Sequence, residues 1–293
     1  MTLEQLRVFV AVAEREHVTR AAEALNMAQS AASASIAALE GRHGVKLFHR
    51  VGRGIALTEA GALFLVEALA VLARTTAAEL VLSELGGLKR GTLLVQASQT
   101  IASYWLPRYL VTFRRLHPGI DIRLMVGNTV QVAHAIHEGL AELGFVEGAV
   151  DDPVLDISTV ARDQLVIVVG REHPWAGCGA IEPERLVESD WVLREAGSGT
   201  RSVFEAALAG FGIAPSSLRV VLSLPSNESV RAAVEAGMGA TAISASVAAS
   251  SIEAGLLYAV GPTLPEREFN VLRHAERYRS RAAEALLAII TAA

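Results

Sequence analysis

Four short polar segments lie in the C-terminal part of the chain, each where an expected strand leads into an expected helix. They read SQT at 98–100, GNT at 127–129, GSGTR at 197–201 and SNES at 226–229. A helix N-terminus exposes backbone N–H groups that attract anions, and hydroxyl or amide side chains add hydrogen bonds. One such segment can be a simple helix cap, but four at strand ends favour a binding site for a small anion.

The candidate ligand-binding residues are the short polar side chains of these segments, with one glycine and one arginine. The hydroxyl groups would donate hydrogen bonds to an oxyanion or carboxylate, Gly199 would allow close approach of the backbone, and Arg201 would add counter-charge. The full set is Ser98, Thr100, Asn128, Thr129, Ser198, Gly199, Thr200, Arg201 and Asn227.

Other chemistries have weaker support. His134 and His137 have helical i, i+3 spacing, but no third metal ligand is evident. The GSGT string lacks the lysine of a phosphate-binding P-loop and is not a G-x-S-x-G nucleophile motif. Cys178 has no second cysteine to pair with. We therefore expect no enzyme activity, metal or cofactor. A cytoplasmic ligand-binding protein or an enzyme of the same α/β fold is the alternative.

Composition and charge indicate a folded protein with a small basic region. Of 293 residues, 52% are hydrophobic and 19% charged, enough apolar material for a sizeable core. The formal net charge is −5, yet residues 1–57 hold seven Lys and Arg against five Asp and Glu. Four of those basic residues fall between 42 and 53. This pattern indicates a local anionic partner such as DNA, although a solvated basic loop has the same composition.

The sequence also predicts a cytoplasmic protein without membrane association. Its first residues, MTLEQLRVFV, lack the basic n-region of an export signal. The longest uncharged stretch, 236–252, is rich in Ala, Gly and Ser and is a poor membrane span. A single cysteine excludes an internal disulfide framework and favours a reducing compartment.

The basic region needs a scaffold, and the apolar spacing before it predicts a helix-turn-helix. Apolar residues at helical spacing indicate helices over 3–13, 18–25 and 29–39. Thr19 is the expected cap of the second helix, and Asn26 suits a tight left-handed turn before the third. The third helix of such an arrangement can enter the major groove of DNA.

A β-hairpin is expected next. The strand-like runs 45–50 and 55–57 flank a Gly-x-Gly turn that carries Arg53. An arginine at the tip of such a wing can reach the DNA backbone or a narrow minor groove. An ordinary hairpin with a solvated arginine is the alternative.

In order and spacing these N-terminal motifs resemble the winged helix-turn-helix of LysR-type transcriptional regulators. The matching strings are LRVFVAVAE at 6–14, TRAAEAL at 19–25, AQSAAS at 28–33, LE at 39–40, GVKLFHR at 44–50 and LTEAG at 57–61. The resemblance implies base contacts from Gln29, Ser30 and Ser33. It also implies phosphate or minor-groove contacts from Thr19, Arg20, Arg50 and Arg53.

A long helix is expected at 59–86, capped by Thr58 and followed by a glycine-rich hinge at 87–91. Its apolar pattern covers more than one side, so a second face must be buried. The resemblance implies pairing with the same helix of another subunit, and we expect Leu69 and Leu72 on the pairing face. Packing within the same chain is the alternative.

From residue 92 onward, strand-like and helical runs alternate, which predicts an α/β body. The resemblance implies a fold of two Rossmann-like subdomains, like a periplasmic binding protein, with a ligand cleft between them. The expected domains are a DNA-binding domain at 1–58, the linker helix, the hinge and an effector domain at 92–293. Within the last, subdomain I covers 92–161 and 266–293, and subdomain II covers 162–265.

The string REAGSGTR at 194–201 is similar to the branch that includes regulators of sulfur and of carbon-dioxide assimilation, whose effectors are mostly anions. The whole resemblance implies a sequence-specific transcriptional regulator. Its implied partners are double-stranded DNA, a small anionic effector, RNA polymerase, and further copies of the chain in a homodimer or homotetramer.

Overall fold

The computed structural model describes residues 1–51, 54–85 and 91–292, which fall into two compact units. One unit consists of Met1–Leu82 and Glu138–Leu140, and the other consists of Ser83–His137 and Ala141–Ala293. Arg53 and most of the predicted hinge, 87–90, lie outside the described residues.

The first unit is a helix-turn-helix with a hairpin, as expected. Its elements are α1 (Leu3–Arg15), α2 (Val18–Ala24), α3 (Gln29–His43), β1 (Phe48–Val51), β2 (Gly54–Leu57) and α4 (Glu59–Leu85). Asn26, between α2 and α3, has φ 53°, the left-handed conformation expected of it. The prediction that Thr19 caps α2 was wrong. His17 is the residue before the helix, and its Nδ1 atom accepts a hydrogen bond from the backbone N–H of Arg20, whereas Thr19 lies inside the first turn.

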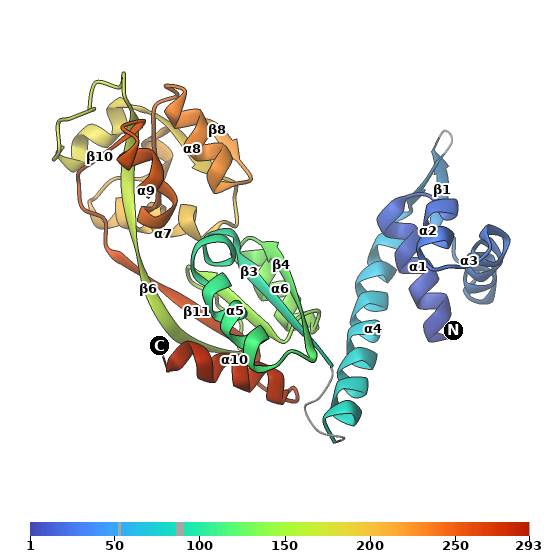
Figure 1. Ribbon diagram of the computed structural model, residues 1–293. Coiled ribbons are helices and arrows are strands. Elements are labelled where there is room, and N and C mark those ends of the chain that lie inside the picture. The colour runs from blue at the N-terminus through green and yellow to red at the C-terminus, as the bar shows by residue number, and fades with distance from the viewer. Residues whose placement is uncertain (52–53, 86–90, 293) are drawn as a thin grey trace. The chain divides into compact units, whose positions relative to one another are not determined.

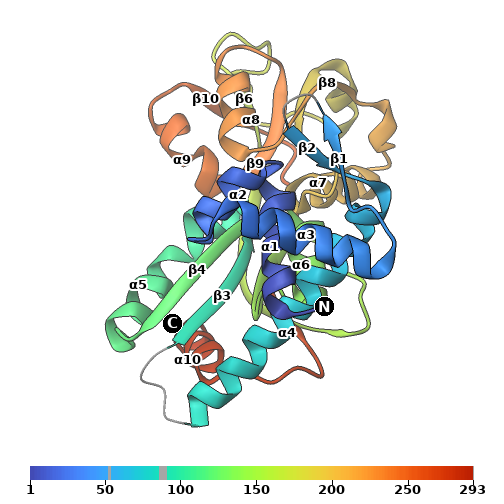
Figure 2. The same ribbon diagram turned by 90° about the vertical axis from the view of Figure 1, so that its right-hand side faces the viewer.

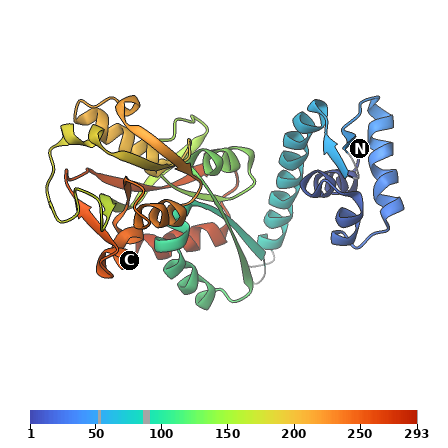
Figure 3. The ribbon, with the colours of Figure 1, turned by 90° about the horizontal axis from the view of Figure 1, so that it is seen from above.

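One face of α4 packs within the first unit. Figure 3 shows this helix (cyan) running alongside the blue helices of the same unit. Leu69 and Leu72 are partly buried against the core formed around Leu6 and Phe9, which favours the alternative that this stripe packs within its own chain. Leu63, half a turn around α4 from Leu72, is 70% exposed, and Val66 is 43% exposed within a single chain.

The second unit is built on one mixed sheet. Its strands are β3 (Gly91–Ser98), β4 (Ile120–Gly127), β5 (Leu143–Glu147), β6 (Leu155–Gly170), β7 (Asp190–Arg194), β8 (Arg219–Leu224), β9 (Ala240–Ser244), β10 (Leu257–Val260) and β11 (Glu266–His274). Its α-helices are α5 (Pro107–Leu116), α6 (Thr129–Glu138), α7 (Gly199–Gly210), α8 (Asn227–Glu235), α9 (Ala245–Glu253) and α10 (Arg281–Thr291). Short helical turns cover Ile101–Trp105, Pro183–Glu188 and Pro215–Ser217. The strand order is β4-β3-β5-β11-β6-β9-β7-β8, with β10 on β6.

Two long strands join two lobes of this sheet, as Figure 1 shows. The first part of β6 pairs with β11, and the last part pairs with β9 and β10. Lobe I contains β3, β4 and β5, and lobe II contains β7 to β10. The chain therefore runs from lobe I to lobe II along β6 and returns along β11. The α/β fold class predicted from the sequence is confirmed.

Helices cover both faces of each lobe. In lobe I, α5 and α10 pack on one face through Phe113 and Leu286, and α6 packs on the other through Val132. Figure 2 shows β3 and β4 side by side, with α5 next to β4. In lobe II the rings of Trp191 and Phe204 pack with their centroids 4.9 Å apart. These packed layers hold the carboxyl ends of the parallel strands in place, where the polar segments follow.

Among the described helices, none combines the length and the apolarity that a membrane-spanning helix needs.

Candidate functional site

The polar candidates of the first unit lie on its surface. Gln29 and Ser30 are exposed at the start of α3, and the Gln29 Nε2 atom donates to the Ser33 Oγ atom at 3.0 Å, one turn further along. Thr19 and Arg20 are exposed on α2. These side chains are thus free to meet a partner without disturbing the core.

The hairpin is tied to α3 by a buried carboxylate. The Glu40 Oε1 atom accepts hydrogen bonds from the amides of Leu47 (2.9 Å) and Phe48 (3.3 Å). Its Oε2 atom lies 2.6 Å from the Lys46 Nζ atom. These contacts fix the start of β1 relative to α3, and β1 carries the exposed Arg50.

Glu40 should make the first unit sensitive to acid. Burial raises the pKa of Glu40, but the Lys46 contact and the two amide hydrogen bonds lower it more, so the net pKa lies below its usual 4.5. The stabilisation is therefore present above pH 4.5 and is lost as the pH falls through the lowered pKa. We expect Glu40→Gln to cost about 1–2 kcal/mol at pH 7 and much less at pH 3.5. Calorimetric unfolding against pH measures the difference, with the exposed Glu14→Gln as control. A cost that does not change with pH would contradict this.

In the second unit, three of the predicted hydroxyl groups hydrogen-bond to Glu147, a residue that the sequence did not indicate. Glu147 ends β5 and its side chain is only 2% exposed. The hydroxyls of Ser98 and Thr200 donate to its two carboxylate oxygens, the second at 3.3 Å. The Thr129 hydroxyl donates to its backbone carbonyl at 2.8 Å. Residues from both lobes therefore converge on Glu147.

One guanidinium completes this cluster from the returning strand. Arg267, on β11, is 1% exposed, and its Nη1 atom lies 3.7 Å from the Glu147 Oε1 atom and 3.0 Å from the Thr200 hydroxyl. Its Nε atom donates to Asp163, on β6, at 2.8 Å. The second oxygen of Asp163 accepts from the Ser244 hydroxyl. One buried cation thus faces two buried carboxylates.

A second set of hydrogen bonds joins the lobes around Asn227. Its Nδ2 atom donates to the Thr100 hydroxyl at 3.0 Å, and its Oδ1 atom accepts from Arg194 at 2.8 Å. The Oε1 atom of Gln99 accepts from the backbone N–H of Asn227, and its Nε2 atom donates to Glu228, each at 2.7 Å. All of these bonds except that to Arg194 cross from one lobe to the other.

The edge of this set is formed by an aromatic hydroxyl. Tyr104 donates to Glu228 at 3.2 Å. Burial raises the pKa of Tyr104, and the charge of Glu228 raises it further, so the phenol keeps its proton at neutral pH.

Gly199 lies where the lobes touch. A Cβ atom there would be 1.5 Å from the Glu147 carbonyl oxygen and 2.5 Å from the Thr129 hydroxyl. Only glycine therefore permits this approach of α7 to the end of β5. The sequence predicted that Gly199 lets a ligand approach the backbone closely, but in the structure it is Glu147 and Thr129 of the same chain that lie against this glycine.

The remaining candidates lie apart from Glu147. Asn128 caps the first turn of α6 and reaches Glu195 at 3.4 Å. Ser198 is buried at the start of α7. Arg201 pairs with Glu205 along α7 at 2.7 Å and does not contact Glu147.

Three residues of the cluster were missed: Glu147, Asp163 and Arg267. Glu147 had a signal, because it directly follows the expected strand 143–146 at the same sheet edge as the polar segments. Asp163 and Arg267 had none, since each lies inside a strand among residues of mixed polarity. Pairing of β6 with β11 places Arg267 opposite Asp163.

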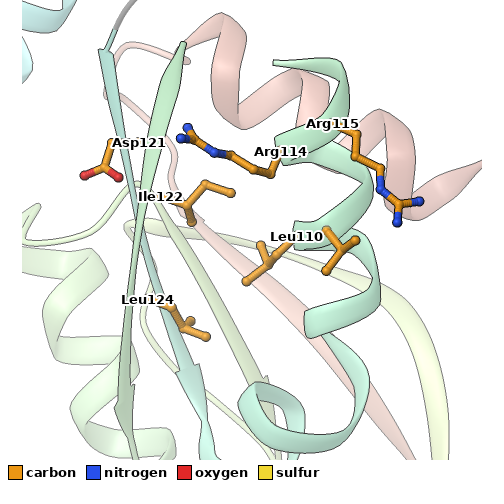
Figure 4. A pocket seen from close by; sticks show the side chains of 7 residues that line it. Leu110, Arg114, Arg115, Asp121, Ile122 and Leu124 are labelled. Carbon is orange, nitrogen blue, oxygen red and sulfur yellow. The ribbon is translucent and has the colours of Figure 1, made fainter. Parts of the chain in front are cut away.

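A separate hollow of about 470 Å³ lies between α5 and the edge strand β4 (Figure 4). The side chains of Leu110 and Ile122 lie between the helix and the strand, and Arg114 and Asp121 also line the hollow. None of its lining residues belongs to the cluster around Glu147.

Within the described part of the chain, no group of three or more His, Cys, Asp or Glu side chains could hold a metal ion.

Family models match both units. Residues 3–62 match the bacterial regulatory helix-turn-helix protein model of the lysR family, and residues 86–293 match the LysR substrate binding domain. The chain belongs to the LysR family of transcriptional regulators. The family assignment implied by the N-terminal motifs is thereby confirmed, as is the expectation that the protein is a regulator and not an enzyme.

Individual LysR regulators are similar over most of the chain. A probable RuBisCO transcriptional regulator of Cyanophora paradoxa is 34% identical, covering 96% of this chain and 89% of its own. The crystal structure of CbnR, a LysR family regulator, has a TM-score of 0.75 at 22% identity and covers 99% of this chain and 98% of its own. The regulatory domain of Synechocystis PCC6803 CcmR in complex with 2-PG has a TM-score of 0.62 at 26% identity. It covers 69% of this chain and 97% of its own.

Proposed function

We propose that this LysR regulator binds specific DNA sequences as a homodimer or homotetramer and is controlled by a small anionic effector held between the lobes of its second unit. In this proposal it acts in the cytoplasm, where it contacts RNA polymerase at a promoter.

Sequence recognition is assigned to α3 and the hairpin. The supporting observation is that Gln29, Ser30, Thr19, Arg20 and Arg50 are exposed polar or basic side chains on a helix-turn-helix and its wing. A side-chain amide can make two hydrogen bonds with the edge of one base, whereas arginine can neutralise phosphates regardless of sequence.

Gln29→Ala is expected to weaken specific DNA binding by about 1–3 kcal/mol and to leave binding to unrelated DNA nearly unchanged. Arg50→Ala is the matched comparison: it should weaken both and reduce the salt slope by about one. Fluorescence anisotropy with specific and unrelated duplexes at several salt concentrations measures both effects. Equal losses on both duplexes for Gln29→Ala would make Gln29 a phosphate or scaffold residue.

Dimerisation is assigned to the outer face of α4. Leu63 and Val66 are exposed apolar side chains one turn apart on α4, and neither belongs to the core against which Leu69 and Leu72 pack. An apolar stripe of this kind is stabilised when a second copy covers it.

The double variant Leu63→Glu, Val66→Glu is expected to dissociate the dimer, because both charges would be buried against apolar surface. Each subunit should stay folded, since both side chains are exposed in the single chain. Val71→Glu is the control, as this exposed valine lies about 80° around the helix from Leu63. Sedimentation velocity gives the mass. An unchanged mass of the double variant would exclude this face.

Effector binding is assigned to the cluster around Glu147. The observation that carries this part is that Ser98, Thr200 and Arg267, from both lobes, all direct donor groups at one carboxylate. A donor set that fits a carboxylate also fits an oxyanion or a small carboxylic acid. Binding there would change lobe closure, and this change would alter DNA affinity by linkage.

A thermal-shift screen tests the effector class. The probes are sulfite, sulfate, phosphate, small carboxylates and 2-PG, with neutral and cationic compounds of similar size as controls. A ligand at 100 times its dissociation constant stabilises the folded protein by about 2.7 kcal/mol. We expect an anion to give the largest shift. Stabilisation by neutral or cationic compounds alone would exclude an anionic effector.

A further inference from the structure

Hydrogen-bond donors and one guanidinium surround the side chain of Glu147. Arginine can only donate hydrogen bonds, so the Thr200 hydroxyl must accept from Arg267 and turn its own proton toward the Glu147 Oε1 atom. The Ser98 hydroxyl supplies the other oxygen. Both carboxylate oxygens are therefore occupied by donors, and with 2% exposure little water can compete.

The charges around this position do not leave room for a second anion. Arg267 is the one cation of the cluster, and it already faces both Glu147 and Asp163. An anion that reached Arg267 and Thr200 while Glu147 stayed in place would lie beside two like charges in a site of low polarity, which is strongly unfavourable. An incoming anion must therefore take the place of one carboxylate.

Glu147 is the carboxylate better able to leave. Its charged contact with Arg267 is long, at 3.7 Å, whereas Asp163 approaches the same guanidinium at 2.6 and 2.8 Å. Asp163 also lies in the middle of β6, but Glu147 is the last residue of β5 and precedes Gly148, at φ 111°.

We propose that Glu147 is a tethered competitor of the effector: its carboxylate occupies the anion site of the empty cleft, and an anion binds by displacing it from Ser98, Thr200 and Arg267. This rests on the proposed function of the cleft. The measured affinity for the effector is then the difference between two binding free energies, that of the effector and that of the Glu147 carboxylate for the same donors. Displacement of Glu147 also releases a hydrogen bond between the lobes, which couples binding to lobe closure.

The test is calorimetric titration of the full chain with inorganic sulfate and phosphate. Glu147→Gln removes the competing charge at nearly constant shape and is expected to bind one of these ions at least tenfold more tightly than the wild type. Glu228→Gln is the matched control, because it removes a carboxylate from the lobe junction without touching Ser98, Thr200 or Arg267. Its affinity should stay within about twofold of the wild type.

A shorter side chain gives an independent variant. Glu147→Asp keeps the charge but withdraws it from Ser98 and Thr200, so its affinity should lie between those of the wild type and Glu147→Gln. If circular dichroism shows that Glu147→Gln does not fold, the affinity of Glu147→Asp is the test of the proposal. Wild-type or weaker affinity of the folded Glu147 variants, or an equal gain in Glu228→Gln, would overturn the proposal. An error in the proposed function appears differently, as a wild-type protein stabilised only by neutral or cationic compounds.

Discussion

Replacing Arg267 by methionine is expected to destabilise the second unit by about 3–5 kcal/mol, which is a large part of the stability of a typical domain. The side chain is 1% exposed and pairs with both Glu147 and Asp163. Without the guanidinium, two carboxylates remain buried with no cation beside them, and their mutual repulsion adds to the cost of desolvation. Methionine keeps much of the volume, so the loss reports mainly the charge.

Arg162→Met is the matched control. This arginine lies on the neighbouring crossing strand, is 68% exposed, and forms a surface pair with Glu266 at 3.6 Å. Its removal should cost no more than about 1 kcal/mol. Urea unfolding followed by tryptophan fluorescence measures both, because Trp105, Trp175 and Trp191 all lie in the second unit. A cost below about 1 kcal/mol for Arg267→Met would show that water or protonation compensates the two carboxylates.

Gly199→Ala is expected to move the lobes apart at the start of α7 and to lower the free energy of unfolding by about 1–3 kcal/mol. The new Cβ atom would lie 1.5 Å from the Glu147 carbonyl oxygen, an overlap that no side-chain rotation can relieve because the obstacle is backbone. Either α7 or the end of β5 must shift. The adjacent hydrogen bond from Thr200 to Glu147 should weaken with that shift.

The control for Gly199→Ala lies at the other end of the same helix. A Cβ atom at Gly210 would have no neighbour within 4 Å, so Gly210→Ala should be neutral or stabilise the unit by up to about 1 kcal/mol. Hydrogen exchange distinguishes the two variants. Amides at the end of β5 and in the first turn of α7 should exchange faster in Gly199→Ala only. Wild-type exchange and stability in that variant would show that the lobes do not close as tightly as this contact requires.

Local patterns in the sequence determined much of the architecture. The helices of the first unit follow from apolar residues at helical spacing, and the turn at Asn26 follows from a residue that tolerates φ 53°. The expected runs at 143–146, 165–169 and 191–193 are strands of the sheet. Such patterns are visible because one face of each element is buried, and burial leaves a periodic trace.

Two features could not be predicted from the spacing of apolar residues: the capping residue of α2 and the face of α4 that packs on its own chain. Thr19 has a capping side chain, but it falls inside α2, and His17 occupies the capping position. Leu69 and Leu72 lie on an apolar stripe like Leu63 and Val66, yet the core of the first unit covers only the former pair. A helix with two apolar faces does not reveal from its own sequence which face its own chain buries.

The polar segments at strand ends could be found from the sequence because a strand followed by a helix start is a local pattern. Ser98 and Thr129 follow neighbouring parallel strands of lobe I, and Thr200 follows a strand of lobe II; all three hydrogen-bond to Glu147. What they meet was decided only by the tertiary structure. Pairing of β6 with β11 brings Arg267 to Asp163 across 104 residues of chain, and the end of β5 brings Glu147 to both lobes. The sequence predicted donor side chains at these strand ends, and only the tertiary structure decided that a carboxylate of the chain itself accepts their hydrogen bonds, because its neighbours come from distant strands.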